Sequence, residues 1–207
     1  STTQINAYSR DKNPRRTHPK ISENKRRRKN LSILTFLHDC SHFRKKSLSS
    51  LLETLPIKGI YTLIIMVNTK SRLKVGKLGY FNFKKGYYAY TGSALGNGAT
   101  SLKRRVARHI KKEKPKNWHI DFLLANKNAR VSAVIAAKSV NKECQINNLI
   151  KKIQGAKVPI AGFGTSDCKQ NCKSHLIYFG EENIEEKIVD TYTRLFGHDE
   201  PRKPINP

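Results

Sequence analysis

The chain has 207 residues, of which 41 are Lys or Arg and 15 are Asp or Glu, so its formal net charge at pH 7 is +26. A chain of this length can bury a core without crosslinks, and we expect one domain with extensions. The charge favours nucleic acid as the partner, because each neutralised phosphate releases counterions whatever the base sequence. An anionic membrane is the weaker alternative, because the basic residues lie in coil-like runs and on one short helix.

The sequence also argues against a membrane-spanning or secreted protein. The longest apolar run, residues 60–67, already contains Thr62 and is far shorter than the roughly 18 to 20 residues that span a bilayer. The first residues are too polar for a secretory signal. The four cysteines are too few and too unevenly spaced for a disulfide framework. We therefore expect a cytoplasmic protein associated with a nucleoid or a ribonucleoprotein, and no membrane partner.

Residues 1–30 are predicted to be a basic, disordered arm. They contain Arg26, Arg27 and Arg28 but almost no apolar spacing, so they cannot bury enough surface to offset their conformational entropy. We expect the arm to order on a partner, and a plain solvated tail is the alternative. Residues 31–56 repeat apolar side chains at helical spacing as far as Pro56, and they predict a helical extension.

The centre of the chain predicts an antiparallel sheet followed by a helix. Residues 60–67 and 87–91 are rich in β-branched and aromatic side chains, and turn residues flank the segment between them. The helix that follows places Leu102, Val106 and Ile110 on one stripe.

The second half predicts further alternating elements. We expect helices over 118–124, 141–154 and 181–196, strands over 131–137 and 175–179, and a glycine-bearing loop over 159–172. This pattern indicates an α+β domain over residues 57–180, followed by a C-terminal helix and tail over 181–207.

Two tripeptides and a helix resemble the signature of the GIY-YIG nuclease superfamily. Gly59-Ile60-Tyr61 opens the first strand, and Tyr90-Thr91-Gly92 closes a later one. The matching positions downstream are Leu102, Arg105, Val106 and His109 on the next helix, and Glu143 in a later helix. The resemblance covers roughly residues 57–180. It is closest to a little-characterised, largely archaeal branch that shares the runs 92–95, 118–121 and 162–164.

That resemblance implies a small three-stranded antiparallel sheet flanked by helices, one divalent metal, usually Mg²⁺, and hydrolysis of a phosphodiester. The chain departs from the family pattern at Thr91, where isoleucine or valine is usual. The interval from Tyr61 to Tyr90 is also longer than typical, which suggests an inserted strand or hairpin around residues 74–83 and leaves open how the two tyrosines approach each other.

Tyr61 is the preferred general base by the family resemblance, with Tyr90 as its companion. A free tyrosine has a pKa near 10, so either could accept a proton at neutral pH only if a cation or metal lowered its pKa. The alternative is a pair of packed core tyrosines.

Arg105 and His109 lie four residues apart and therefore on one side of their helix, where a guanidinium can reach a phosphate. A surface ion pair and a half-buried histidine are the respective alternatives. Glu143 is the predicted Mg²⁺ ligand, since an otherwise basic site needs a carboxylate, with a helix-start glutamate as the alternative and Asp121 in reserve.

Basic residues on and after the same helix are predicted to bind the nucleic-acid backbone, together with the three arginines of the arm. They are Lys103, Arg104, Arg108, Lys111 and Lys112. Arg104 and Arg108 lie on other sides of the helix than Arg105, and we expect them to be solvated or to contact the nucleic-acid backbone.

A second candidate metal site comprises Cys168, Cys172 and His175, separated by three and two residues, with Cys144 or His119 as a fourth ligand. Tetrahedral Zn²⁺ accepts such a set, although the spacing is not that of a standard zinc knuckle. Reduced, partly buried thiols are the alternative.

Together these patterns predict a metal-dependent endonuclease acting on DNA or RNA, directed by its arm, a targeting protein or a large ribonucleoprotein. A non-catalytic protein that binds nucleic acid or a ribonucleoprotein is the main alternative. A purely zinc-dependent scaffold is the third hypothesis.

Overall fold

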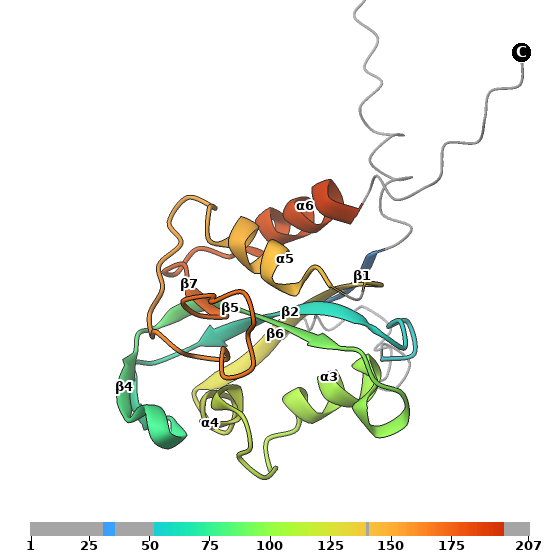
Figure 1. Cartoon of the computed structure of the whole chain (residues 1–207). Coiled ribbons are helices and arrows are strands. Elements are labelled where there is room, and N and C mark those ends of the chain that lie inside the picture. Colours follow the sequence, from blue (N-terminus) through green and yellow to red (C-terminus); the bar gives the residue numbers. More distant parts are fainter. Residues whose placement is uncertain (1–30, 36–51, 140, 197–207) are drawn as a thin grey trace, which may run out of the picture.

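The computed structural model describes residues 31–35, 52–139 and 141–196, and Arg26, Arg27 and Arg28 of the predicted arm lie outside these ranges. The fold is α+β. A twisted antiparallel sheet forms the middle layer, with α5 and α6 on one face and α3 and α4 on the other (Figure 1). No helix in the described ranges is long and apolar enough to cross a membrane.

The sheet is larger than the three strands expected from the family resemblance. Four antiparallel strands form its body, and a further strand pairs with one edge. In spatial order they are β1 (Leu31–Thr35), β6 (Ala129–Ala137), β2 (Gly59–Val67), β5 (Gly86–Ala94) and β7 (Leu176–Tyr178). The additional strands supply backbone partners to β5 and β6, whose outer edges would otherwise leave N–H and C=O groups unpaired.

The prediction of a helix beginning at Leu31 is wrong for residues 31–35. This segment pairs antiparallel with β6, Leu31 opposite Ala137 and Thr35 opposite Ala133. A short apolar run such as Leu-Ser-Ile-Leu-Thr is compatible with both periodicities, so the open edge of β6 decides its conformation. Residues 36–51 of the predicted extension lie outside the described ranges.

The long interval between the two tyrosine motifs forms a separate hairpin. Strands β3 (Ser71–Lys74) and β4 (Tyr80–Phe83) pair with each other around a short 3-10 turn, η1 (Gly76–Leu78). Because the insert makes its own two-stranded sheet, β2 and β5 pair directly along nine residues each.

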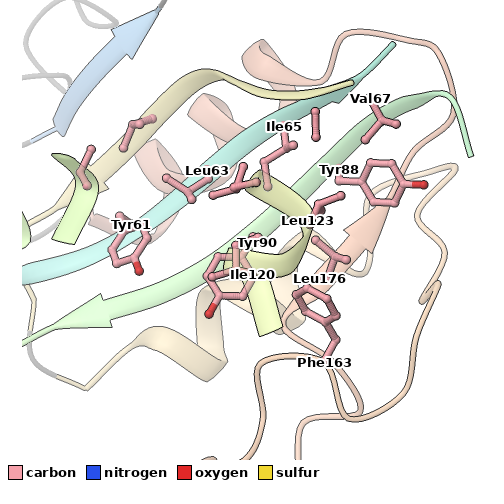
Figure 2. Packing of buried hydrophobic residues seen from close by; sticks show 14 of the residues in the cluster. Tyr61, Leu63, Ile65, Val67, Tyr88, Tyr90, Ile120, Leu123, Phe163 and Leu176 are labelled. Carbon is pink, nitrogen blue, oxygen red and sulfur yellow. The ribbon is translucent and has the colours of Figure 1, made fainter. Parts of the chain in front are cut away.

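Alternate residues of β2 enter two different cores. Tyr61, Leu63 and Ile65 pack toward helices α3 (Leu102–Ile110) and α4 (His119–Leu124), as Figure 2 shows for the side chains it labels. Ile60 and Ile64 pack toward α5 (Glu143–Ile150) and α6 (Glu185–Phe196). This two-residue alternation places both tyrosines of the motifs on the α3–α4 face.

Candidate functional site

A pocket of about 300 Å³ opens between the sheet, α3, the start of α4, the start of α5 and the 159–172 loop. We call it the tyrosine pocket. All five residues predicted to be catalytic line it, although they come from four elements far apart in the sequence: Tyr61 of β2, Tyr90 of β5, Arg105 and His109 of α3, and Glu143 of α5.

The register between β2 and β5 brings the two tyrosines together. Tyr61 lies opposite Gly92 and Leu63 lies opposite Tyr90, so the tyrosines occupy diagonal positions on one face. Figure 2 shows both hydroxyl groups pointing away from the sheet to the same side. The inserted hairpin therefore does not separate them.

Thr91, the departure from the family pattern, faces the opposite side of the sheet. Its hydroxyl lies 3.2 Å from Oγ1 of Thr62, which in turn lies 2.9 Å from the hydroxyl of Tyr192 in α6. The three hydroxyls satisfy one another in an otherwise apolar interface. Thr91 is thus linked to α6 through Thr62, and it does not line the tyrosine pocket.

Tyr61 and His109 form a buried hydrogen-bonded pair, with 2.8 Å between the tyrosine hydroxyl and Nε2. Burial raises the pKa of Tyr61 well above its usual value. Burial, together with the charges of Lys114, Arg105 and Arg108, lowers the pKa of His109 to about 3. Both groups are therefore neutral at pH 7, and the hydroxyl donates to Nε2 when the imidazole carries its proton on Nδ1.

Tyr90 is neutral for the same reason. Burial raises its pKa, and the negative charge of Glu143 adds to the effect, while Arg105 opposes it. The protein's own cations thus do not lower the pKa of either tyrosine enough to make a tyrosinate at neutral pH. A tyrosinate base would need an additional positive charge in the pocket.

Arg105 is half-buried at the wall of the pocket and stacks on Trp118, with its guanidinium carbon 4.9 Å from the ring centroid. Arg108 approaches the same ring to 4.6 Å. The planar indole holds the guanidinium of Arg105 at the pocket wall without neutralising it, so the group stays available to an anion.

Asp121, the reserve metal ligand, has a structural role instead. Its Oδ2 accepts hydrogen bonds from Arg108 at 2.8 Å and from the backbone N–H groups of Asn117 and Trp118 at 3.0 and 2.9 Å. The carboxylate is fully buried at the first turn of α4 and does not line the tyrosine pocket. It caps the helix and anchors Arg108.

Glu143 begins α5 and extends its carboxylate into the pocket. Ser93 Oγ donates to its Oε2, and Nδ1 of His175 lies 3.0 Å from its Oε1. Burial by itself would raise the pKa of Glu143, but the contacts with His175 and Ser93 and the charge of Arg105 together lower it. Glu143 therefore presents an ionised carboxylate to the pocket.

The basic residues on and after α3 that were predicted to bind nucleic acid fall into three groups. Lys112 donates to the backbone carbonyls of Leu124, Asn126 and Ala129, and Arg108 is held by Asp121, so both stabilise the packing of α3 against its neighbours. Lys103 pairs with Glu53. Arg104 and Lys111 are exposed to solvent.

The three described cysteines are free thiols and converge with one histidine. Sγ of Cys144, Cys168 and Cys172 and a ring nitrogen of His175 all lie within 4.8 Å of one another, a group that could hold a metal ion. Cys144, and not His119, completes the set. Nδ1 of His119 instead accepts a hydrogen bond from the N–H of Gly164 at 3.0 Å.

Five further residues line the pocket although no role was predicted for them from the sequence: Ser93, Asn117, Trp118, Ser166 and Asp167. Trp118 is the one tryptophan of the chain and lies among basic residues, which is the pattern that could have indicated it. No local pattern marks Ser93 or Asp167, which the loop and the end of β5 bring to the pocket.

A comparison with known protein families matches a segment that contains every residue lining the tyrosine pocket. Residues 60–197 match the family described as a domain of unknown function, DUF123. The chain belongs to the DUF123 family. No curated protein and no solved structure matches it. The part of the chain matched to DUF123 contains Tyr61, Tyr90, the residues of α3, Glu143, the cysteine cluster and α6.

Proposed function

We propose that this DUF123 protein is a metal-dependent endonuclease of the GIY-YIG type that hydrolyses phosphodiester bonds in DNA or RNA. The observation that carries the proposal is the convergence of Tyr61, Tyr90, Arg105, His109 and Glu143 on one solvent-accessible pocket. An arginine, a carboxylate and oriented hydroxyls within one pocket are what in-line phosphoryl chemistry requires.

In this proposal Arg105 binds the phosphoryl oxygens. Its guanidinium lies against Trp118 at the pocket wall, and its five donors in a fixed plane suit bidentate binding of a phosphate. The positive charge also offsets the charge that develops on the equatorial oxygens during attack. A lysine at this position would keep the charge but not the planar geometry.

His109 holds the hydroxyl of Tyr61, and the pair orients the attacking water. The low pKa of His109 makes it a poor proton store, so we assign it to positioning and not to general base catalysis. Tyr61 becomes the base only when a cation opposes the burial that raises its pKa.

Glu143 and the pocket around it suit a hard cation, for which we propose Mg²⁺. The carboxylate is ionised and partly exposed, and Asp167 contributes a second carboxylate to the same pocket. Mg²⁺ commonly binds through one or two carboxylates and keeps several waters. When bound, it would supply the positive charge that favours deprotonation of a water or of Tyr61. For the cysteine cluster, the soft thiolates favour Zn²⁺.

Nucleic acid would approach along the hairpin and α3. On the outer face of the hairpin, Arg72 and Lys74 lie 5.3 and 6.0 Å from the ring of Tyr80, which is 63% exposed. The hairpin packs beside α4 (Figure 1), and the first residue of α4, His119, lines the tyrosine pocket. With Arg104 and Lys111, these residues would supply salt-dependent affinity for phosphates.

The second candidate function is that of a non-catalytic nucleic-acid-binding protein, such as a component of a ribonucleoprotein. The raised pKa values of Tyr61 and Tyr90 favour it, because two protonated phenols in a pocket can bind a phosphate without hydrolysing it. The presence of an ionised Glu143 beside them favours the enzyme.

Cleavage assays distinguish the nuclease from the non-catalytic binding protein. Labelled duplex DNA, single-stranded DNA, branched DNA and structured RNA would be incubated with the full chain, with and without Mg²⁺. The nuclease proposal expects Mg²⁺-dependent cutting that Glu143→Gln and Tyr61→Phe reduce by at least about 10²-fold. Glu186→Gln at an exposed position of α6 and Tyr88→Phe outside the pocket are the matched controls. Tight, salt-sensitive binding with no cutting of any substrate would favour the binding protein.

A further inference from the structure

The cysteine cluster joins three parts of the chain that lie at or beside the tyrosine pocket. Cys144 lies in the first turn of α5, directly after Glu143. Cys168 and Cys172 belong to the loop that carries Gly164 and Asp167 to the pocket. His175 immediately precedes β7, and its backbone carbonyl accepts the N–H of Thr91 in β5.

The spacing of the cluster matches a tetrahedral metal site. Zn–S bonds of about 2.3 Å in a tetrahedron place two sulfurs roughly 3.8 Å apart. Here Sγ of Cys144 and Sγ of Cys168 are 3.5 Å apart, and all four ligand atoms lie within 4.8 Å of one another. Asn171, with φ of 50°, is the non-glycine residue of the described chain with positive φ, and it turns the short segment between Cys168 and Cys172.

The surroundings of His175 independently favour a metal ion at the cluster. Its side chain is 3% exposed, yet neither ring nitrogen makes a well-aligned hydrogen bond with any described residue. Nδ1 has a contact of 3.0 Å with Oε1 of Glu143, and Nε2 has no hydrogen bond of good geometry although the thiols of Cys168 and Cys172 lie beside the ring. A buried imidazole nitrogen without a partner is costly, and a bound metal would satisfy it.

We propose that Cys144, Cys168, Cys172 and His175 bind one zinc ion, and that His175 holds the carboxylate of Glu143 in the tyrosine pocket. The ring binds metal through Nε2, because Nδ1 faces Glu143. A metal-bound neutral imidazole carries its proton on the other nitrogen, so Nδ1–H donates to Oε1. Ser93 donates to the other oxygen, Oε2, and the two donors together fix the carboxylate.

Zinc thus connects to Glu143 by two routes, through the peptide bond to Cys144 and through the imidazole of His175. The ion itself lies outside the tyrosine pocket, since none of its four ligands lines that pocket. His175 is therefore a positioning residue. The zinc site stands on its own geometry, whereas the consequence for hydrolysis rests on the proposed function, in which Glu143 binds Mg²⁺.

Zinc content tests the site directly. The full chain, purified without chelator, should contain about one zinc ion per molecule, and the double variant Cys168→Ser/Cys172→Ser should lose it. Cys40→Ser changes the one cysteine of the chain that the proposal does not assign to zinc, and this variant should keep the ion. Replacing zinc by Co²⁺ in the wild-type protein should produce thiolate-to-metal absorption bands, a reading that does not depend on whether the double variant folds. Absence of zinc, or Co²⁺ without those bands, would overturn the site.

NMR of the protein labelled with ¹⁵N-histidine tests the hydrogen bond from His175 to Glu143. One ring should show a metal-bound Nε2 and a slowly exchanging Nδ1–H. In Glu143→Ala the Nδ1–H should exchange rapidly while Nε2 stays metal-bound, and Asp167→Ala should change neither. A slowly exchanging Nδ1–H that persists in Glu143→Ala would overturn the positioning role.

His175→Cys separates zinc binding from positioning. A fourth thiolate should retain about one zinc, but it has no Nδ1–H to donate to Glu143. The Mg²⁺ concentration for half-maximal cleavage should then rise by about tenfold or more, as for other outer-shell partners of metal sites. Unchanged Mg²⁺ dependence in a zinc-loaded variant would count against positioning. If the wild-type protein cleaves nothing, the proposed function fails, while zinc content and NMR still decide the zinc site.

Discussion

Tyr61 lies directly over Gly92, its partner across the β2–β5 ladder, and a β-carbon at position 92 would come within 2.6 Å of the tyrosine hydroxyl oxygen. The glycine of the second motif therefore makes room for the ring of the first. The two tripeptides are one structural unit, in which a missing side chain on β5 lets the Tyr61 hydroxyl reach His109 of α3.

Gly92→Ala should consequently displace Tyr61 and destabilise the protein by about 1 to 3 kcal/mol, the usual cost of overpacking. In a Tyr61→Leu background the same change should cost less than half as much, because the atoms it meets are gone. Urea unfolding of the four proteins in a double-mutant cycle measures this coupling. Additive effects would show that the alanine is accommodated without contact with Tyr61.

The buried His109 should make stability fall as the pH is lowered. The unfolded chain binds the proton near pH 6.5, whereas the folded protein does so only near pH 3, where burial and three cations hold the pKa of His109. Between these pH values the unfolded state therefore binds more protons than the folded state. The contribution of the neutral His109 to the free energy of unfolding is lost as the pH falls through that window, by up to about 1.4 kcal/mol per pH unit.

His109→Gln provides the comparison, since glutamine can accept the Tyr61 proton but does not titrate. Its free energy of unfolding, measured in urea at pH 4, 5, 6 and 7, should depend less steeply on pH than that of the wild type. Parallel curves for the two proteins would show that His109 has the same pKa in the folded and unfolded states, as an exposed imidazole would.

Arg105 and Arg104 form a matched pair on α3, one at the pocket wall and one exposed. Arg105→Lys should reduce cleavage by about 10²-fold, because a point charge replaces the planar donors beside Trp118. Arg104→Lys should stay within about threefold of the wild type. Equal losses in both variants would indicate that the two arginines contribute only general charge.

The hairpin should account for part of the salt dependence of nucleic-acid binding. Arg72→Ala/Lys74→Ala should reduce the slope of log affinity against log salt by about 1.4 to 1.8, the loss of two phosphate contacts. Lys152→Ala/Lys157→Ala, which removes the same charge from exposed positions after α5, should leave the slope nearly unchanged. Identical slopes for both double variants would place the binding surface elsewhere.

The local sequence predicted most elements but not how many strands the sheet contains. The helices near 102, 118, 143 and 185 and the strands near 59, 86, 129 and 176 lie close to their predicted positions, because apolar spacing along each segment is a local property. Leu31–Thr35 differs, because a five-residue apolar run takes its conformation from the edge it pairs with.

For the site, the sequence by itself determined the chemical inventory: two tyrosines at strand positions, Arg105 and His109 four residues apart on a helix, Glu143 at a helix start, and the closely spaced Cys168, Cys172 and His175. Tertiary structure alone decided how each is used. Burial made the Tyr61–His109 pair neutral, and Asp121 became a cap for α4 and the partner of Arg108. Cys144 joined the cysteine cluster, whereas His119 accepts the N–H of Gly164. Protonation and ligation depend on desolvation and on partners distant in sequence, and only the packed fold brings those together.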